Sequence, residues 1–205
     1  MRNNIYNELN EFISGLNEDK IENERISKLN VLIEFIQKKK DQNEAIDLNF
    51  ICTHNSRRSH LCQVWAKTIA SFYTIEKVKC FSGGTEATAV YPVIIKTLEN
   101  TGFKITKLEG DTNPTYKLSF NEEMCPMTLF SKIYDDEYNP KTDFAAVMTC
   151  NDADQNCPII LNSTRISLPY VDPKVSDGTD QQPEVYAERS LQIDTEMKYV
   201  FSQIK

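Results

Sequence analysis

Two residue types that could do chemistry on an anion, Cys52 and Arg58, stand six positions apart. They bound the loop Cys-Thr-His-Asn-Ser-Arg-Arg-Ser at positions 52–59, which follows an apolar run and precedes a segment of helical periodicity. A strand, a tight loop and a helix start in that order aim backbone N–H groups and a helix dipole at one point. An oxyanion held there would lie between the Arg58 guanidinium and the Cys52 sulfur. The same positive field favours the thiolate form of cysteine, which makes Cys52 a candidate nucleophile.

The other residues of the loop suit the same role. Asn55 can adopt the left-handed backbone conformation that a tight loop around an anion needs, and Ser59 places a hydroxyl near the sulfur. The alternative is a buried structural cysteine beside a surface arginine, because the Cys-x5-Arg spacing alone is weak support. The expected anion-binding residues are Thr53, His54, Asn55, Ser56, Arg57 and Arg58.

The composition restricts the class of protein. The 205 residues are enough for one well-buried domain, and a net charge of −7 argues against a nucleic-acid binder, which usually carries a basic face. No apolar run approaches the length of a membrane span, and the N-terminus lacks the apolar core of a signal peptide. These features favour a cytoplasmic protein without a membrane partner. Its six cysteines are then expected to be free thiols, chemically active groups or metal ligands rather than a disulfide framework.

The elements that position the loop alternate between strand and helix. Strands are expected at 48–52, 78–81, 115–120, 129–134, 145–149 and 165–168, and helices at 59–73, 92–100 and 183–205. This alternation predicts a three-layer α/β fold, in which a central parallel sheet of about four strands is flanked by helices. Ligands of such sheets bind at the carboxyl ends of the strands, where Cys52 would lie.

Residues 1–45 are predicted to form a helical N-terminal extension, followed by a catalytic domain at 46–205. Two stripes of apolar residues repeat there at helical spacing, and the second ends in three lysines at 38–40, where cations suit a helix C-terminus. No catalytic residue type stands out in the extension. Its stripes could pack on the main domain or on a second copy of the chain, so a homodimer is one expectation.

Four segments together resemble the low-molecular-weight protein tyrosine phosphatase superfamily, and more narrowly its thioredoxin-coupled arsenate reductase branch. The loop at 52–59 is similar to the family's Cys-x5-Arg-Ser loop with its internal Asn. Positions 81–87, Phe-Ser-Gly-Gly-Thr-Glu-Ala, resemble the strand-end segment of the reductases, and Asp172-Pro173 stands where the family carries its acid loop. Positions 147–158 resemble the redox segment of the reductases, with Cys150 and Cys157 at the end of a strand. The resemblance covers about residues 46–204 and implies the phosphatase-like fold.

The chain departs from this family pattern at several positions. His54 replaces a small glycine of the loop, and Arg57 stands where many members carry a second loop cysteine. Lys174-Val175 follows the Asp-Pro pair in place of the aromatic pair that phosphatases use to flank a tyrosine ring. The segment 111–141 is longer than expected and contains Cys125. The missing aromatic pair favours a small oxyanion over phosphotyrosine.

The first chemical step would be attack of the Cys52 thiolate on a tetrahedral oxyanion. Loop N–H groups and the planar fork of Arg58 would hold the spectator oxygens, and Ser59 would hydrogen-bond the sulfur. Asp172 would protonate the departing oxygen as a general acid. The alternative for Asp172 is a turn carboxylate next to a proline, which is common.

Cys150 and Cys157 decide between two reactions. With a phosphate ester, water hydrolyses the Cys52 adduct and no further thiol is required. With arsenate, a second thiol can attack the Cys52 sulfur, expel arsenite and leave a disulfide. The resemblance implies a relay in which Cys150 attacks Cys52, Cys157 attacks Cys150, and the resulting disulfide goes to thioredoxin. The alternatives are two ordinary loop cysteines or, disfavoured because neither histidine lies near, a zinc site.

The sequence thus favours arsenate reduction on a phosphatase scaffold. The second hypothesis is a protein tyrosine phosphatase. The third hypothesis is a redox or oxyanion sensor whose N-terminal helices form a partner surface. No bound cofactor is expected beyond an external thiol reductant. The resemblance also suggests a monovalent cation near Asn55, Gln63 and Ser82.

Overall fold

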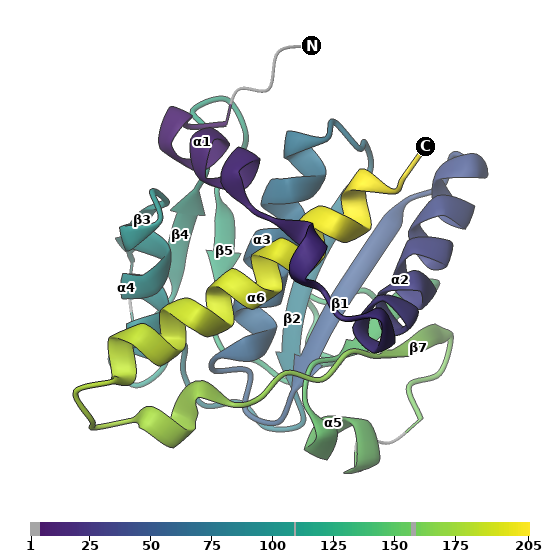
Figure 1. Ribbon diagram of the computed structural model, residues 1–205. Helices are drawn as coiled ribbons and strands as arrows, with labels where there is room; N and C mark the ends of the chain where they lie inside the picture. The colour runs from purple at the N-terminus through teal and green to yellow at the C-terminus, as the bar shows by residue number, and fades with distance from the viewer. Residues whose placement is uncertain (1–4, 109, 157–158) are drawn as a thin grey trace.

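The structure is a computed structural model that describes residues 5–108, 110–156 and 159–205. Figure 1 shows its elements along the chain. They are α1 (Asn7–Gly15), the 3₁₀ helix η1 (Glu18–Lys20), α2 (Asn23–Asp41), β1 (Ile46–Cys52), α3 (Arg58–Phe72), β2 (Val78–Gly84), α4 (Pro92–Asn100), β3 (Lys104–Lys107), β4 (Tyr116–Ser119), β5 (Met127–Leu129), β6 (Phe144–Met148), α5 (Asn151–Asn156), β7 (Ser163–Ser167), the 3₁₀ helix η2 (Pro173–Ser176) and α6 (Gln182–Ser202).

A four-stranded sheet in the order β2-β1-β6-β7 lies at the centre, and its strand pairs are all parallel. This confirms the predicted fold class. The register pairs Cys52 with Gly84 of β2 and Ile51 with Met148 of β6. The carboxyl ends of β1, β2 and β6 therefore meet at one edge of the sheet, where the loop at 52–59 begins.

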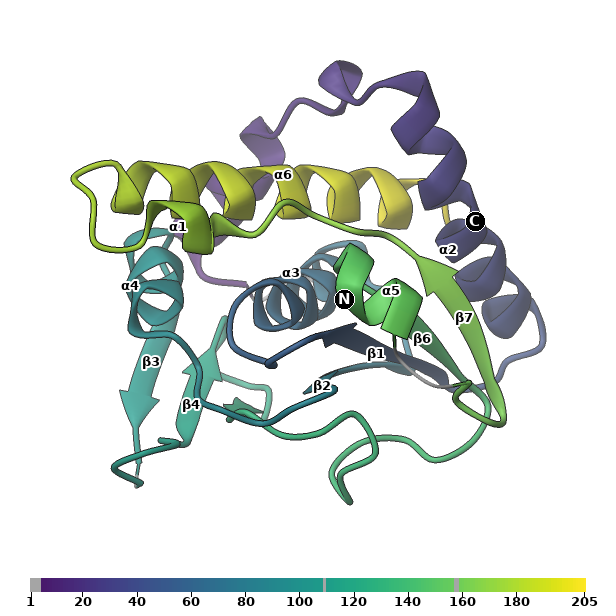
Figure 2. The ribbon, with the colours of Figure 1, turned by 90° about the horizontal axis from the view of Figure 1, so that it is seen from below.

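Helices α2, α3 and α6 cover one face of this sheet, as the view along the strands shows (Figure 2). Trp65 of α3 is fully buried there between Phe12 and Phe103, with ring centroids 5.6 and 5.1 Å away. On the other face, Tyr134 packs against a smaller apolar cluster that includes Ile51 and Met148, and Ala153 of α5 belongs to the same cluster. Packing on both faces leaves β1 buried along almost its whole length, including the polar Asn49.

The N-terminal helices pack against the chain's own last helix. Leu9 of α1 and Leu29 of α2 are fully buried in the same core as α3 and α6. Arg25 forms an ion pair with Glu196 of α6 at 2.7 Å, and Lys198 of α6 donates to the Leu16 carbonyl at 2.7 Å. Within the described ranges, none of the helices has the length and apolar character needed to cross a membrane.

Two features of the fold were not predicted. Strands β3, β4 and β5 form a separate antiparallel sheet, and the strand expected at 129–134 is limited to Met127–Leu129, followed by loop. Helix α5 follows β6 directly. The residues of β3 are mostly exposed and α5 is built of polar residues, so neither carries the apolar period from which an element is recognised.

Candidate active site

The loop at 52–59 connects the end of β1 to the first turn of α3 in a tight path. Asn55 has φ of 43°, which confirms the expected left-handed conformation. The end of β2 lies directly against the loop, because Thr85 N donates to the Cys52 carbonyl and Glu86 N to the Thr53 carbonyl. A Cβ atom added at Gly84 would lie 2.6 Å from the Thr53 carbonyl oxygen and 2.7 Å from Asn55 N, so this close approach requires glycine.

A chain of hydrogen bonds ends on the sulfur of Cys52. Lys132 N donates to Asn55 Oδ1 at 2.8 Å, and Asn55 Nδ2 donates to Ser59 Oγ at 2.9 Å. Since Ser59 Oγ accepts that bond, its own hydrogen is free to point at Cys52 Sγ, 3.2 Å away. The arrangement orients a hydroxyl donor toward the sulfur.

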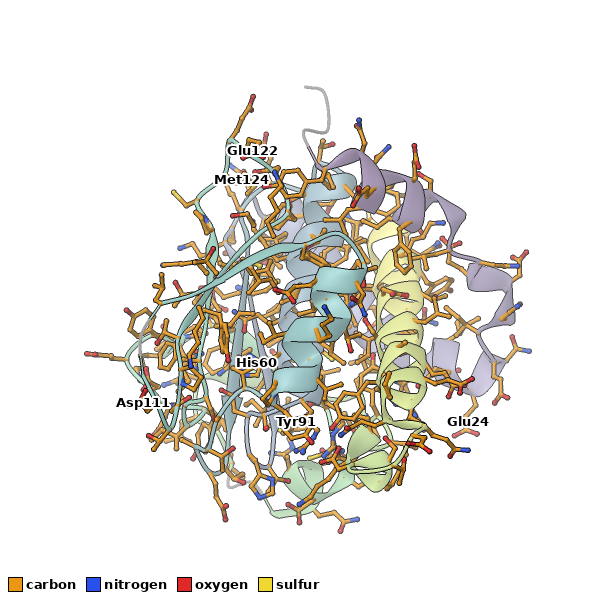
Figure 3. All side chains as sticks on the ribbon, turned by 90° about the vertical axis from the view of Figure 1, so that its left-hand side faces the viewer. Glu24, His60, Tyr91, Asp111, Glu122 and Met124 are labelled. Atoms are coloured by element: carbon orange, nitrogen blue, oxygen red, sulfur yellow. The ribbon has the colours of Figure 1, made fainter. Side chains whose placement is uncertain are left out.

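The loop rests on a buried polar layer, in which a supporting role was expected for Asn55 and Ser82 but not for His60 or Lys132. His60, which is labelled in Figure 3, is fully buried in the first turn of α3. It bonds the Asn55 carbonyl through Nε2 at 2.9 Å and Ser82 Oγ through Nδ1 at 3.3 Å. Burial, together with the nearby charge of Lys132, lowers the pKa of His60 to about 3, so the ring is neutral at pH 7. Burial also lowers the pKa of Lys132 to about 8.

These residues do not fit the monovalent cation suggested by the resemblance. Asn55 Oδ1 already accepts from the Lys132 N–H group, and Ser82 Oγ already pairs with His60. Gln63 Oε1 is buried without a hydrogen-bond partner in the described structure, but Lys132 already brings positive charge to this layer. A second cation would be repelled. Across the described ranges, no group of three or more His, Cys, Asp or Glu is arranged to hold a metal ion.

Arg58 and Asp172 come together although they are far apart in sequence. Arg58 Nη2 lies 2.5 Å from Asp172 Oδ2, and its Nη1 donates to the Tyr170 carbonyl at 3.0 Å. Asp172 also caps η2 by accepting from Lys174 N at 3.1 Å. Asp172 is therefore a turn residue that also lies beside the loop arginine, and its role as general acid stays a prediction.

The neighbouring loop residues are held by other parts of the chain. The Arg57 guanidinium turns to Asp177, at 2.6 Å, and to the hydroxyl of Tyr186, also at 2.6 Å. The Ser56 carbonyl accepts from Tyr91 N at 3.0 Å. His54 is about half exposed, with Nε2 3.6 Å from a carboxylate oxygen of Glu86. What Arg57 can offer an anion is its backbone N–H group, because its side chain is engaged elsewhere.

Cys150 lies beside the loop at the end of β6. It is buried in the same apolar cluster as Cys52, together with Met148 and Ala153. Its Sγ lies 3.5 Å from Thr53 Oγ1 and accepts from Ala153 N at 3.3 Å. Thr53 Oγ1 also donates to Asp152 Oδ2 at 2.8 Å. Cys157 lies outside the described residues.

The remaining described cysteines have no comparable setting. Cys62 and Cys80 are buried, and burial raises the pKa of Cys62 well above its ordinary value and that of Cys80 to about 12. Cys125 is exposed. Only Cys52 and Cys150, among the described cysteines, share one cluster at the carboxyl edge of the sheet.

Comparisons with known proteins agree with this geometry. No protein-family model matches the chain. Arsenate reductase 2 of Staphylococcus epidermidis is 30% identical over 116 residues, which cover 57% of this chain and 69% of that protein. A solved arsenate reductase in its phosphate-binding state aligns over 78% of this chain and 99% of its own, with a TM-score of 0.52 and 18% identity. A low-molecular-weight protein tyrosine phosphatase from Bacillus subtilis aligns over 77% and 96%, with a TM-score of 0.51 and 15% identity.

The two kinds of comparison carry different weight. The structural neighbours are too distant in sequence to show more than the fold, which is the phosphatase-like one expected here. The curated relative is similar enough, over enough of its length, to identify the family. The chain belongs to the arsenate reductase family, and its fold is that of the low-molecular-weight phosphatases.

Proposed function

We propose that this protein reduces arsenate to arsenite, with Cys52 as nucleophile and with Cys150 and Cys157 as a thiol relay to a thioredoxin-like reductant. The observation that carries the proposal is the position of Cys150. Its sulfur lies 3.5 Å from the hydroxyl of Thr53, the residue directly after Cys52, and both cysteines pack in one buried cluster. Hydrolysis of a phosphate ester makes no use of a thiol there.

In the first step, the Cys52 thiolate attacks arsenic and forms an S–As bond while one arsenate oxygen departs as water. Ser59 donates to the sulfur, and the loop N–H groups hold the spectator oxygens. Arg58 joins them by exchanging its bond to Asp172 for one to the incoming oxyanion. Asp172, which the incoming oxyanion displaces from the guanidinium of Arg58, takes up a proton from solvent and then supplies it to the departing oxygen.

In the second step, the thiolate of Cys150 attacks the sulfur of Cys52. The S–As electron pair stays on arsenic, which is reduced from As(V) to As(III) and leaves as arsenite, and a Cys52–Cys150 disulfide forms. Ala153 N donates to the Cys150 sulfur, whereas Thr53 Oγ1 gives its hydrogen to Asp152 and accepts from the Cys150 thiol. Cys157 then attacks Cys150 and frees Cys52, and an external dithiol reduces the Cys150–Cys157 disulfide.

The test measures arsenite release with thioredoxin, thioredoxin reductase and NADPH, for the parent chain and for Cys150→Ser and Cys157→Ser. Hydrolysis of an aryl phosphate is measured in parallel. Loss of arsenate turnover in both variants, with hydrolysis retained, is the expected result. Unchanged arsenate turnover in both variants would eliminate the relay.

Phosphomonoester hydrolysis is the second candidate, because Cys52, Arg58 and Asp172 meet around one loop and suffice for it. The same assay separates the two. Aryl phosphate turnover that greatly exceeds arsenate turnover, with no effect of either thiol variant, would favour the phosphatase. Anion binding without turnover of either substrate would favour an oxyanion sensor.

A further inference from the structure

Both arginines of the loop are tied to the same short segment, which runs from Tyr170 to Asp177. Arg58 contacts the start of this segment through the Tyr170 carbonyl and Asp172. Arg57 contacts its end through Asp177. The Arg58–Asp172 ion pair joins two residues of the proposed reaction. The Arg57–Asp177 ion pair takes no part in the proposed chemical steps.

The contacts of Arg57 form a closed and largely buried network. Its Nη2 and Nε donate to Asp177 and Tyr186 at 2.6 Å each, and Tyr186 donates in turn to the other oxygen of Asp177 at 2.6 Å. Gln182 donates to both Asp177 and the Tyr91 hydroxyl, at 3.0 Å each. The guanidinium carbon lies 4.0 Å from the centroid of the Tyr91 ring, which stacks on Tyr186.

The network keeps its charges at neutral pH. Burial alone would raise the pKa of Asp177, but the hydrogen bonds from Tyr186 and Gln182 and the charge of Arg57 outweigh it and hold that pKa below its ordinary value. Only 12% of the Arg57 side chain and 22% of the Asp177 side chain is exposed, so the ion pair is poorly screened by solvent.

The segment is anchored at its start by buried Tyr170, whose N–H group donates to the Thr149 carbonyl at 3.0 Å, and at its end by this network. Helix η2 is one 3₁₀ turn, with Asp172 as its N-cap and Asp177 as its C-cap. Pro173 and Ser176 are buried, but Val175 is 78% exposed. Because η2 is only four residues long, holding Asp177 in place also sets where Asp172 lies relative to the loop.

We infer that Arg57 is a positioning residue, which holds Asp172 at the anion loop by clamping Asp177 at the other end of η2. The inference rests on the proposed use of Asp172 as proton donor, but not on the relay through Cys150. Arg57 supplies its backbone N–H group to the loop, while its side chain sets the geometry of proton donation.

The experiment compares two aryl phosphates, since both report on Cys52 and Asp172 without using Cys150. Phenyl phosphate has a weakly acidic leaving group that needs a proton, and 2,4-dinitrophenyl phosphate has a strongly acidic one that does not. General-acid catalysis contributes roughly 10²–10⁴-fold where it is needed. We expect Arg57→Met to lower kcat/KM for phenyl phosphate about 10- to 100-fold and for the dinitrophenyl ester less than about threefold.

A double-mutant cycle separates positioning from general stability. Combined with Asp172→Asn, Arg57→Met should cause no further loss on phenyl phosphate or on arsenate, because both changes remove one proton donation. Asp177→Asn should reproduce the effect of Arg57→Met, and Arg57→Lys should restore part of it by keeping the ion pair. These two variants also serve if Arg57→Met does not fold. Equal losses on both esters, or losses that multiply with those of Asp172→Asn on both substrates, would overturn the inference.

Discussion

Lys132 gives the most quantitative prediction, because the free-energy cost of burying its charged amine can be calculated from its pKa. Its side chain is almost fully buried under the loop, and burial lowers its pKa from 10.5 to about 8. Below pH 8 the folded and unfolded chains both carry the proton, and the folded state bears the full cost of burying the charge. Between pH 8 and 10.5 only the unfolded chain keeps its proton, so stability rises with pH. The difference between the two pKa values corresponds to about 3 kcal/mol at pH 7.

Lys132→Met removes this cost while leaving an unbranched apolar side chain. The backbone N–H bond to Asn55 is unaffected by the change. The ammonium nitrogen lies 4.5 Å from the Phe130 ring centroid, and losing that contact offsets roughly 0.5–1 kcal/mol. We therefore expect the variant to be more stable than the parent by about 2 kcal/mol at pH 7, and by much less at pH 10.

Urea unfolding at pH 7, 8, 9 and 10 measures the difference. Lys104→Met is the matched control, because Lys104 is an exposed lysine paired with Glu122 and its loss should change stability little. The parent should unfold at the same urea concentration in potassium chloride and in tetramethylammonium chloride of equal strength. A variant that is less stable than the parent at pH 7, or a stability difference that does not vary with pH, would refute this reasoning. If potassium chloride stabilised the parent chain and tetramethylammonium chloride did not, the result would support a potassium site near Asn55, Gln63 and Ser82.

Three substitutions around the loop give further predictions. Ser59→Ala removes the donor 3.2 Å from the Cys52 sulfur and should lower kcat/KM for both arsenate and aryl phosphates about 10- to 100-fold, the value of one hydrogen bond to a charged group. Thr53→Val removes the hydroxyl beside Cys150 and should slow arsenate turnover about 10-fold while leaving ester hydrolysis nearly unchanged. Gly84→Ala places a Cβ within 2.7 Å of loop backbone atoms and should abolish both activities and weaken phosphate binding, measured by calorimetry.

Each of these predictions has an outcome that counts against it. Thr88→Val is the control for Thr53→Val, because its hydroxyl donates to the His54 carbonyl and contacts no sulfur in the described structure. Equal losses in the two threonine variants would mean that contact with Cys150 is irrelevant. Full activity of Ser59→Ala would show that the sulfur needs no donor, and full activity of Gly84→Ala would show that the loop can move away from β2.

The loop and its place in the fold could be predicted because the relevant signals are local. The apolar run before Cys52, the helical period after Arg58 and the strand–helix alternation each need only neighbouring residues. The same is true of β2 and of helix α4, which begins at Pro92 as expected. Together they place the cysteine at the carboxyl edge of a parallel sheet.

What could not be predicted depends on contacts between distant parts of the chain. Arg57 could be read only as a loop residue, since its partners Asp177 and Tyr186 lie 120 and 129 positions away. His60 directly follows Ser59, and its polar character at a buried turn of α3 was the one available signal. The charge of Lys132 under the loop carries no local signature at all, because its burial depends on where the connection after β5 packs.

The proposed reaction depends on direct attack of Cys150 on the sulfur of Cys52, which forms a disulfide between the two residues. The most direct test uses the variant Cys157→Ser, in which the relay stops after that disulfide has formed. The variant is treated with one equivalent of arsenate in the absence of any reductant. Peptide mass spectrometry of the quenched protein should find a Cys52–Cys150 disulfide, with one arsenite released for each disulfide formed. Arsenite released while both cysteines remain free thiols, or a disulfide that joins Cys52 to Cys62, Cys80 or Cys125 instead, would contradict the mechanism.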